Sequence, residues 1–227
     1  MRPLADRLPV TARTPDLAGH GVSYADPGDY SIDAMADRVL ELSDEPVDLV
    51  GYSMGGRVAL AAACRSPQKV RSLSLIGASA GLSDPTARAQ RRDDDEQLAQ
   101  RLETDFAGFV DSWMDSPLFA SQRQLGVAAY AKARRQRLRH DPSELARSLR
   151  FAGTGVMTPL LDQLDRCVMP VSLIVGEHDD KFRAIADDLV VRLPNATVYV
   201  ISGAGHAAHL ERLDAVAEAV MATIGRR

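Results

Sequence analysis

The stretch from Val47 to Cys64 most constrains what this chain can fold into. A short, mostly apolar run, Val47-Asp-Leu-Val50, leads into Gly51-Tyr-Ser-Met-Gly55 and then directly into helix-forming residues. Gly-x-Ser-x-Gly between a strand and a helix is typical of a nucleophile elbow. The turn is so tight that the serine takes a strained backbone conformation, and the flanking glycines remove the Cβ atoms that would collide there. We therefore predict that Ser53 is a catalytic residue; the alternative is an ordinary glycine-rich β–α turn.

Composition restricts the class of protein. The chain has 227 residues, of which 45% are hydrophobic, and a net charge of -4. This length suits one α/β domain carrying a sizeable insertion, and the mild acidity favours neither nucleic acid nor an anionic membrane as partner. No apolar run approaches the ~20 residues of a membrane span, and no secretory segment follows Met1. We expect a cytoplasmic protein that needs no metal or organic cofactor.

Two cysteines, Cys64 and Cys167, are too few for a disulfide framework or a metal knuckle. Cys64 lies on an apolar helix face, and we expect it to be a small buried hydrophobic residue.

Strand and helix patterns alternate at short intervals on both sides of a helical block. This order predicts parallel β/α units and a mostly parallel, twisted sheet flanked by helices. The expected strands are 10–14, 47–50, 70–76, 171–175 and 196–201, and the expected helices around them are 1–7, 32–42, 58–64, 182–193 and 210–224.

Residues 81–167 differ in sequence pattern from the rest of the chain: they contain more charged residues and no strand-like run. An all-helical block inserted between strands predicts a cap over the carboxyl edge of the sheet, where such sheets bind ligands. We therefore expect a core of residues 1–80 and 168–227 and a helical cap of residues 81–167. The expected cap helices are 86–103, 106–115, 121–139, 143–151 and 159–164.

Three strand ends carry, in chain order, a serine, an acid and a histidine. A serine hydroxyl needs an imidazole to take its proton, and the imidazole needs a carboxylate to fix its tautomer. We favour Asp179 over Asp180, whose alternative role is a helix N-terminal charge. We favour His206, directly after Gly205 at a turn, over His209, which is placed to cap the helix or line the cleft.

For the other three histidines we expect no catalytic role. We expect His140 and His178 to be exposed to solvent. His20 lies in a glycine-rich loop, where we expect a structural role with access to the cleft.

Four motifs together resemble the α/β-hydrolase superfamily over nearly the whole chain. They are Gly51-Tyr-Ser-Met-Gly-Gly-Arg57, Asp16-Leu-Ala-Gly-His-Gly-Val-Ser23, Gly176-Glu-His-Asp179 and Gly203-Ala-Gly-His-Ala-Ala-His-Leu-Glu211. Within the superfamily the chain resembles the 2-succinyl-6-hydroxy-2,4-cyclohexadiene-1-carboxylate synthases of menaquinone biosynthesis. That finer resemblance rests on Tyr52, Arg57, Arg88-Ala-Gln-Arg-Arg92, Asp95, Phe109-Val-Asp-Ser-Trp113, Pro117-Leu-Phe119, Arg137-Leu-Arg-His-Asp-Pro142, Gly153-Thr-Gly155 and Lys181-Phe182.

The resemblance implies a lyase that eliminates pyruvate from a cyclohexene precursor carrying several carboxylates. It implies that Ser53, activated by His206 and Asp179, is the base, with Tyr52 beside it and the Met54 N–H as an oxyanion donor. The substrate contacts that it implies are Arg57, Arg91, Trp113 and Arg137.

The residues themselves leave alternatives open at these contacts. Arg57 lies one helical turn after Ser53, and its side chain leans back toward the helix N-terminus, so it can reach over the cleft to a carboxylate. The alternative is an ion pair with a loop acid. Taken alone, Arg91 and Arg137 suit a solvated helix face, and Trp113 suits the core of the cap. The basic run 132–139 lacks the interleaved aromatic residues of a nucleic-acid site.

The sequence departs from the superfamily at its beginning. The superfamily's earlier strands and His-Gly loop, which supplies one oxyanion N–H, have no counterpart before residue 10. We expect one donor to be missing, at a cost of about 3 kcal/mol in transition-state stabilisation, together with an exposed sheet edge.

Two other functions remain open on this evidence. A serine esterase or thioesterase would use the same three residues, and a catalytically silent binding protein would use none of them. The sequence does not fix the oligomeric state.

Overall fold

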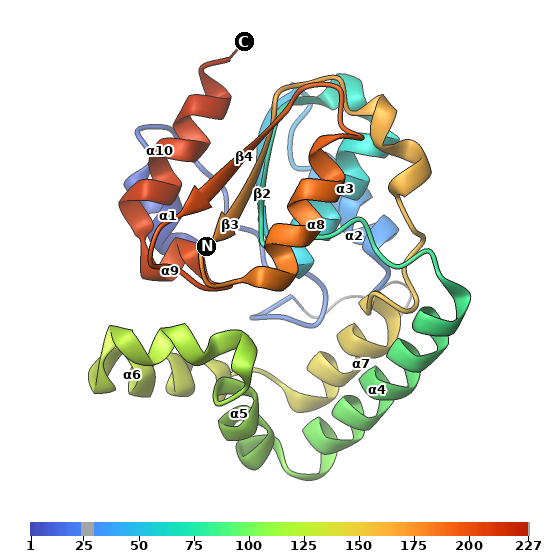
Figure 1. Ribbon diagram of the computed structural model, residues 1–227. Helices are drawn as coiled ribbons and strands as arrows, with labels where there is room; N and C mark the ends of the chain where they lie inside the picture. Colours follow the sequence, from blue (N-terminus) through green and yellow to red (C-terminus); the bar gives the residue numbers. More distant parts are fainter. Residues whose placement is uncertain (24–29, 227) are drawn as a thin grey trace. The chain divides into compact units, whose positions relative to one another are not determined.

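A parallel β-sheet carries the Gly-x-Ser-x-Gly turn (Figure 1). In the computed structural model, which describes residues 1–23 and 30–226, this sheet contains four strands in the order β1-β2-β3-β4, and all neighbouring pairs are parallel. The strands are β1 (Val47–Tyr52), β2 (Val70–Ile76), β3 (Val171–Gly176) and β4 (Ala196–Ile201). Because the strands are parallel, their carboxyl ends lie at one edge of the sheet, and the loops that follow them meet there.

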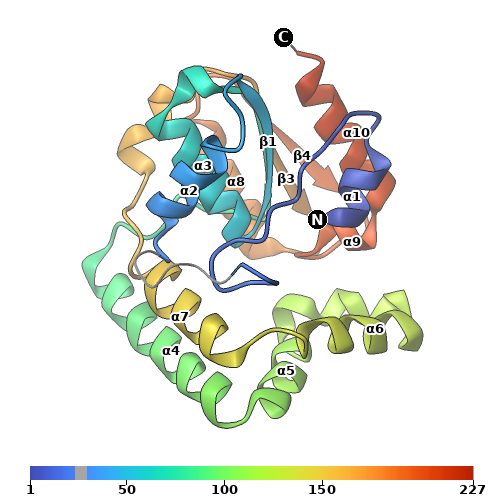
Figure 2. The same ribbon diagram turned by 180° about the vertical axis from the view of Figure 1, so that it is seen from behind.

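Helices cover both faces of this sheet, as Figures 1 and 2 show from opposite sides. On one face lie α3 (Met54–Arg65) and α8 (Asp180–Val190); on the other lie α1 (Arg2–Arg7) and α10 (Leu213–Ile224). The alanine-rich centre of α3 is almost entirely buried, so the helix approaches the sheet closely. Coverage on both faces explains why β3 is apolar and buried along its whole length.

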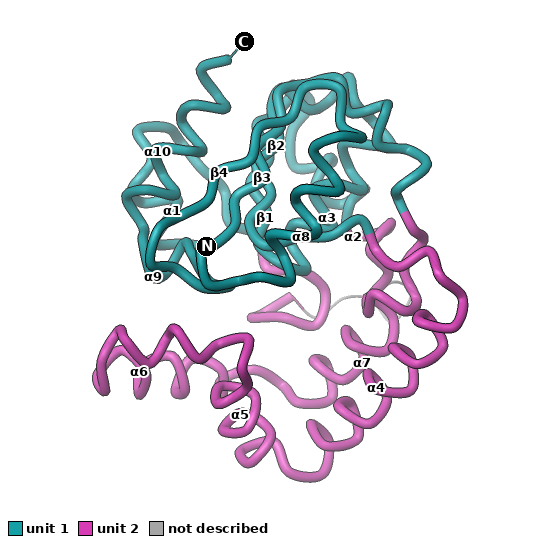
Figure 3. Tube along the Cα trace, in the orientation of Figure 1, with its two compact units in different colours: residues 1–15, 36–80, 160–227 teal, residues 16–35, 81–159 magenta. Residues whose placement is uncertain are grey.

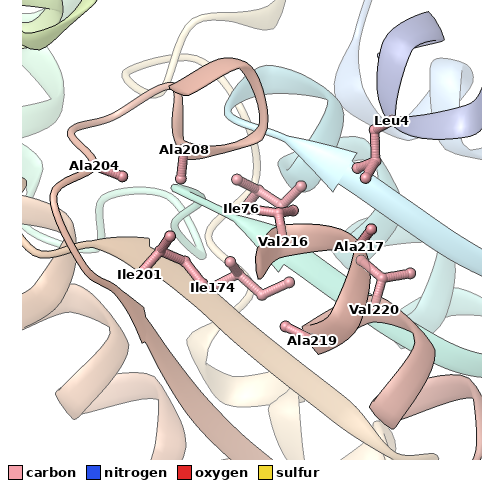
Figure 4. Packing of buried hydrophobic residues seen from close by; sticks show 10 residues of the cluster. All are labelled: Leu4, Ile76, Ile174, Ile201, Ala204, Ala208, Val216, Ala217, Ala219 and Val220. Carbon is pink, nitrogen blue, oxygen red and sulfur yellow. The ribbon is translucent and has the colours of Figure 1, made fainter. Parts of the chain in front are cut away.

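The α10 face of the sheet contains a continuous apolar core (Figure 4). Ile76, Ile174 and Ile201, from three neighbouring strands, pack against Val216 and Val220 of α10. Leu4 of α1 joins the same cluster. These contacts anchor the strand ends from which the loops of the candidate site depart.

The chain divides into two compact units (Figure 3). The sheet unit contains Met1–Pro15, Ala36–Ala80 and Leu160–Arg227; the helical unit contains Asp16–Met35 and Gly81–Pro159. The remaining elements are α2 (Ile32–Leu40), η1 (Pro67–Lys69), α4 (Pro85–Thr104), α5 (Phe106–Met114), η2 (Pro117–Leu125), α6 (Val127–Arg137), α7 (Pro142–Ala152), η3 (Leu161–Arg166) and α9 (Ala208–Glu211).

The helical unit is built on the pairing of α4 with α7. Ala99 and Leu102 of α4 and Ala146 of α7 form a core with Phe109 and Val110 of α5. At the surface, the Arg150 guanidinium of α7 binds two carboxylates of α4, Glu96 and Glu103. One arginine thus joins α7 to two successive turns of α4.

The division differs from the boundaries expected from sequence, which placed residues 1–80 in the core and 81–167 in the cap. Residues 16–35 belong to the helical unit because the Tyr30 hydroxyl donates to Glu144 and the Gly21 N–H donates to His140 Nδ1 at 3.1 Å. Residues 160–167 belong to the sheet unit, where the Leu160 N–H donates to the Ala80 carbonyl at 2.8 Å.

Three expected elements are wrong in detail. Residues 10–14 form no strand, because an extended segment without a hydrogen-bonded neighbour makes no ladder. The expected helix 121–139 is broken at Gly126, whose φ of 87° lies outside the helical region. The expected helix 210–224 is interrupted at Arg212, whose extended φ of -141° separates α9 from α10.

His178 is exposed, as expected, but His140 is half-buried and accepts the Gly21 N–H, so the expectation of a solvent-exposed His140 is wrong. Burial also lowers the pKa of His140. Among the described residues, no helix has the length and apolar character of a membrane span.

We predict that Arg150→Gln destabilises the helical unit. The substitution removes charge-assisted bonds to Glu96 and Glu103, so we expect a small decrease in the free energy of unfolding, since exposed ion pairs are screened by water. Urea unfolding measures the loss. Arg192→Gln is the control. It breaks only the exposed ion pair between Arg192, just after α8, and Asp188 within α8, and it should change the free energy of unfolding by less than half as much. Equal losses would contradict the role of Arg150.

Candidate active site

Ser53 has the strained backbone that the sequence predicts. Its φ of 50° and ψ of -111° make it the only non-glycine residue with positive φ among residues 1–23 and 30–226. The neighbouring glycines are sterically required, because a Cβ on Gly51 would lie 2.3 Å from the Gly55 carbonyl oxygen. A Cβ on Gly56 would lie 2.4 Å from the Ala78 Cβ. The tight turn of an elbow is therefore present.

The Ser53 hydroxyl does not serve the helix that follows it. Ser53 is the N-cap residue of α3, yet its side chain accepts no hydrogen bond from the first turn. A serine at this position usually makes that bond. The hydroxyl instead stands at the helix N-terminus, where backbone N–H groups and the helix dipole favour a developing anion.

Three predicted substrate contacts lie close to Ser53 in the sequence: Tyr52, Met54 and Arg57. Met54 is the first residue of α3, and Arg57 lies in its first turn, where its backbone N–H donates to the Ser53 carbonyl at 3.1 Å. All three residues are half-buried. Their positions are compatible with the roles that the sequence suggests, which remain predictions.

Asp179 and His206 form a buried pair. The His206 Nδ1 and the Asp179 Oδ2 are 2.7 Å apart, and the two residues are 3% and 6% exposed. An ionised carboxylate only accepts hydrogen bonds, so the imidazole proton lies on Nδ1, and Nε2 is the nitrogen that takes up a proton. The other carboxylate oxygen, Oδ1, accepts the Phe182 N–H at 3.3 Å and caps α8.

Asp180, the alternative acid, has no such contact. It is the first residue of α8, its side chain is 94% exposed, and its carboxylate lies 3.7 Å from the Arg183 guanidinium. Its environment is that of a surface helix charge.

The serine and the histidine approach the same strand end. The Ser53 N–H donates to the Ile76 carbonyl at 2.9 Å, and Ile76 is the last residue of β2. The next residue, Gly77, has a φ of 53°, and a Cβ there would lie 2.9 Å from the His206 Cε1. Gly77 thus leaves room for the imidazole. The sequence analysis missed this residue; a glycine directly after a strand was its only signal.

Aromatic rings enclose the imidazole of His206. The ring centroid of Phe182 lies 4.5 Å from that of His206, and the Tyr52 centroid lies 5.2 Å from it. Such tilted contacts restrict the orientation of the imidazole and shield it from water.

Two glutamates hold the loop that carries His206, and the sequence analysis assigned neither a role. The buried Glu211 carboxylate accepts the Gly205 N–H at 2.7 Å. The Glu177 carboxylate accepts the Gly203 N–H at 2.7 Å and the Ser202 hydroxyl at 3.1 Å. The bond from the Gly203 N–H is the main cause that lowers the pKa of Glu177.

His209 is a buried, neutral imidazole. It is 3% exposed, and its ring centroid lies 4.3 Å from that of Tyr52. Its Nδ1 has no hydrogen-bond partner within the described part of the chain. Burial lowers the pKa of His209 to about 3, and the neighbouring His206 acts in the same direction. His209 therefore adds no positive charge beside His206 near neutral pH.

Arg91, Trp113 and Arg137 belong to the helical unit, and their approach to Ser53 stays a prediction. Arg91 Nε donates to the buried Asp95 carboxylate at 2.8 Å, which fixes the guanidinium. Trp113 stacks on Phe109 with centroids 5.7 Å apart and contacts Phe119, so its ring contributes to the helical core. Arg137 is the last residue of α6.

Within the described residues, no group of three or more His, Cys, Asp or Glu side chains is placed to hold a metal ion. A serine, an imidazole and a carboxylate are the groups that serine-based catalysis uses, and the role of Ser53 together with His206 and Asp179 stays a prediction.

This combination of fold and site agrees with a comparison to known families. Residues 1–219 match the family described as "Alpha/beta hydrolase family", and the chain belongs to this family. Its strained serine at a strand-to-helix turn and the sequence order Ser53, Asp179, His206 are those of that fold.

Within the family, the chain is similar to 2-succinyl-6-hydroxy-2,4-cyclohexadiene-1-carboxylate synthases. A putative synthase from Bacillus subtilis (strain 168) is 35% identical over 204 residues, which cover 87% of this chain and 74% of the relative. The synthase from Salmonella typhimurium is 34% identical over 204 residues, which cover 86% of this chain and 76% of the relative.

Solved structures agree. MenH from S. aureus has a TM-score of 0.88 and 32% identity, over 92% of this chain and 81% of that one. A thermophilic esterase from Thermogutta terrifontis, described as malate bound, has a TM-score of 0.78 and 26% identity, over 93% and 78% of the two chains.

We predict that Gly51→Ala destabilises the elbow strongly. The new Cβ meets the backbone of Gly55, which cannot rotate away, so the expected loss is about 3 kcal/mol in the free energy of unfolding. Chemical denaturation measures it. Gly225→Ala is the matched control, because its nearest neighbour would be an ordinary 3.4 Å away; the idea of a sterically closed turn fails if both variants are equally stable.

We predict that His209 makes the protein sensitive to acid. Its pKa is about 3 when folded and near 6.5 when unfolded, so the unfolded chain binds more protons between these values and stability falls as pH decreases from about 6.5 toward 3. At pH 5, protonation of His209 in the unfolded chain lowers the free energy of unfolding by about 2 kcal/mol. His209→Gln should lose less stability than the wild type between pH 7 and pH 5 in urea unfolding.

The exposed His178 provides the control for this measurement. His178→Gln should retain the wild-type dependence on pH. If His209→Gln shows the same acid loss as the wild type, His209 is not the group responsible.

Proposed function

We propose that this protein is a lyase of menaquinone biosynthesis. Its substrate would be 2-succinyl-5-enolpyruvyl-6-hydroxy-3-cyclohexene-1-carboxylate, from which it eliminates pyruvate to give 2-succinyl-6-hydroxy-2,4-cyclohexadiene-1-carboxylate. The observation that carries the proposal is the buried Asp179–His206 pair beside the strand end that holds the strained Ser53. The similarity to synthases named for this product, at 34–35% identity, supplies the reaction.

The proposed mechanism begins with proton transfer inside the triad. His206 Nε2 takes the Ser53 hydroxyl proton, and Asp179 stabilises the imidazolium through its bond to Nδ1. The activated Ser53 oxygen then removes the proton next to the succinyl carbonyl. The electrons of that C2–H bond form the C2=C3 double bond, the C3=C4 double bond of the substrate shifts to C4=C5, and the C5–O bond to the enolpyruvyl group breaks. The departing enolpyruvate takes up a proton on carbon and becomes pyruvate.

Anion stabilisation follows from the position of Ser53. Negative charge develops on the succinyl carbonyl oxygen as the proton is removed. The Met54 N–H at the start of α3 is the proposed donor to this oxygen, supported by the helix dipole.

The negatively charged carboxylates of the substrate would be bound by positively charged side chains. We assign this role to Arg57 on the sheet unit and to Arg91 and Arg137 on the helical unit, with Tyr52 and Trp113 as flat walls. Arg91 suits the role because Asp95 holds its Nε, which leaves the direction of its terminal nitrogens fixed. The helical unit is proposed to act as the cap of the site. The protein is proposed to work in the cytoplasm without a cofactor.

A serine esterase is the second candidate function. The observation that favours it is the structural similarity to the Thermogutta terrifontis esterase, at 26% identity. The same three residues would then carry out acyl transfer, with Ser53 as a nucleophile rather than a base.

We predict that Ser53→Ala abolishes pyruvate release. Removing the group that carries the proton transfer should lower kcat by at least about 10³-fold while the fold is retained. Asp179→Asn should lower kcat by roughly 10⁴-fold, because the amide favours the wrong tautomer of His206. A pyruvate-coupled assay on the cyclohexene precursor measures both losses.

Asp180→Asn is the control, since that exposed neighbour has no contact with His206. It should keep wild-type turnover. Ester cleavage without pyruvate release, abolished by Ser53→Ala, would favour the esterase. If Ser53→Ala changes neither activity, the protein is a binding protein and the proposal is overturned.

A further inference from the structure

The two cysteines of the chain lie in contact, although 103 positions separate them. The Sγ atoms of Cys64 and Cys167 are 3.5 Å apart, and both residues are fully buried. Cys64 lies in the last turn of α3. Cys167 is the first residue after η3, in the connection that leads to β3. Both residues belong to the sheet unit, and η3 packs against α3.

The contact couples the ionisation of the two thiols. The hydrogen bond with Cys167 and burial raise the pKa of Cys64. Either sulfur can be the donor, and the 3.5 Å separation places each sulfur within reach of the other. A thiolate is the form of cysteine that attacks oxidants and disulfides.

Cys167 is buried, but the next residue in the chain lies at the surface. Its neighbour Val168 is 66% exposed, and the preceding element η3 is a 3-10 helix of only six residues. Short elements of this kind open at low free-energy cost compared with central strands.

We propose that Cys64 and Cys167 are a disulfide-forming pair that hydroperoxides oxidise reversibly. The Cys167 thiolate attacks the peroxide O–O bond and becomes a sulfenic acid, while one oxygen leaves as water or alcohol. The Cys64 thiolate then attacks the Cys167 sulfur, the S–S bond forms, and the sulfenic oxygen leaves as water. The two thiols lose two protons and two electrons in total, and the peroxide takes them up.

The bridge has a specific place in the chain. Cys64 precedes and Cys167 follows the whole segment Gly81–Pro159, which forms most of the helical unit. The disulfide would join the two parts of the sheet unit across this insertion. Closing so long a loop restricts the unfolded chain, so the oxidised protein should be the more stable form.

The test oxidises the folded full chain with hydrogen peroxide, removes the peroxide, unfolds the chain in urea and then blocks remaining thiols with an alkylating agent. We expect the intact mass to show the loss of two hydrogen atoms and no alkylation, with both thiols restored by dithiothreitol. The melting temperature should rise by about 5–10 °C on oxidation. After trypsin cuts within the helical unit, the fragments holding Cys64 and Cys167 should migrate together until they are reduced.

Cys64→Ala and Cys167→Ala are the matched controls. Each should keep the wild-type fold and turnover, because neither residue belongs to the catalytic machinery, and each should lack the rise in melting temperature and the linked fragments. The proposal is overturned if the folded protein keeps two alkylatable thiols under peroxide while the urea-unfolded protein loses them. It is also overturned if sulfinic acid or intermolecular disulfide forms instead. No substrate is needed, so the outcome is independent of the proposed function.

Discussion

The hydrogen bond from the Ser53 N–H to the Ile76 carbonyl is the constraint on which the site depends. It fixes the turn after β1 to the last residue of β2, and the positive φ of Ser53 is tolerated because this bond and the surrounding glycines determine the turn completely. The next residue, Gly77, leaves space for the His206 ring. One strand end thus positions both the serine and the histidine, while the neighbouring β3 loop supplies Asp179.

Several hydrogen bonds hold the loops that carry Asp179 and His206. Glu211 and Glu177 hold the histidine loop through backbone N–H groups, and Asp179 divides its two oxygens between His206 and the cap of α8. Because each carboxylate has a definite partner, the imidazole is held by the protein before any ligand arrives. Such preorganisation serves proton transfer in a lyase and in an esterase alike, so the reaction is decided by what surrounds the serine.

The two compact units carry different groups of the predicted site residues. Ser53, Asp179 and His206 belong to the sheet unit, whereas Arg91, Trp113 and Arg137 belong to the helical unit. The helical unit has its own apolar core and its own ion-pair network around Arg150, so its surface can change without disturbing the elbow. Cys64 and Cys167 both belong to the sheet unit, one before and one after the segment Gly81–Pro159 of the helical unit.

The sequence by itself determined the features that depend on near neighbours. The strained turn at Ser53 was predicted from a strand, a glycine-flanked turn and a helix, and the proximity of Asp179 to His206 from their places after strands. The order of strands and helices followed from their periodicity, and the family from four short motifs. The broken helices at Gly126 and Arg212 were missed because helix-forming residues lie on both sides of each break.

Only the tertiary structure decided the contacts between distant residues. Residues 16–35 join the helical unit through Tyr30 and His140, and Gly77 proves to face the His206 ring. Cys64, expected to be an isolated buried hydrophobic residue, meets Cys167 across 103 positions. The physical reason is that turn chemistry and periodicity act over a few residues, whereas the path of the chain through the core decides which distant side chains touch.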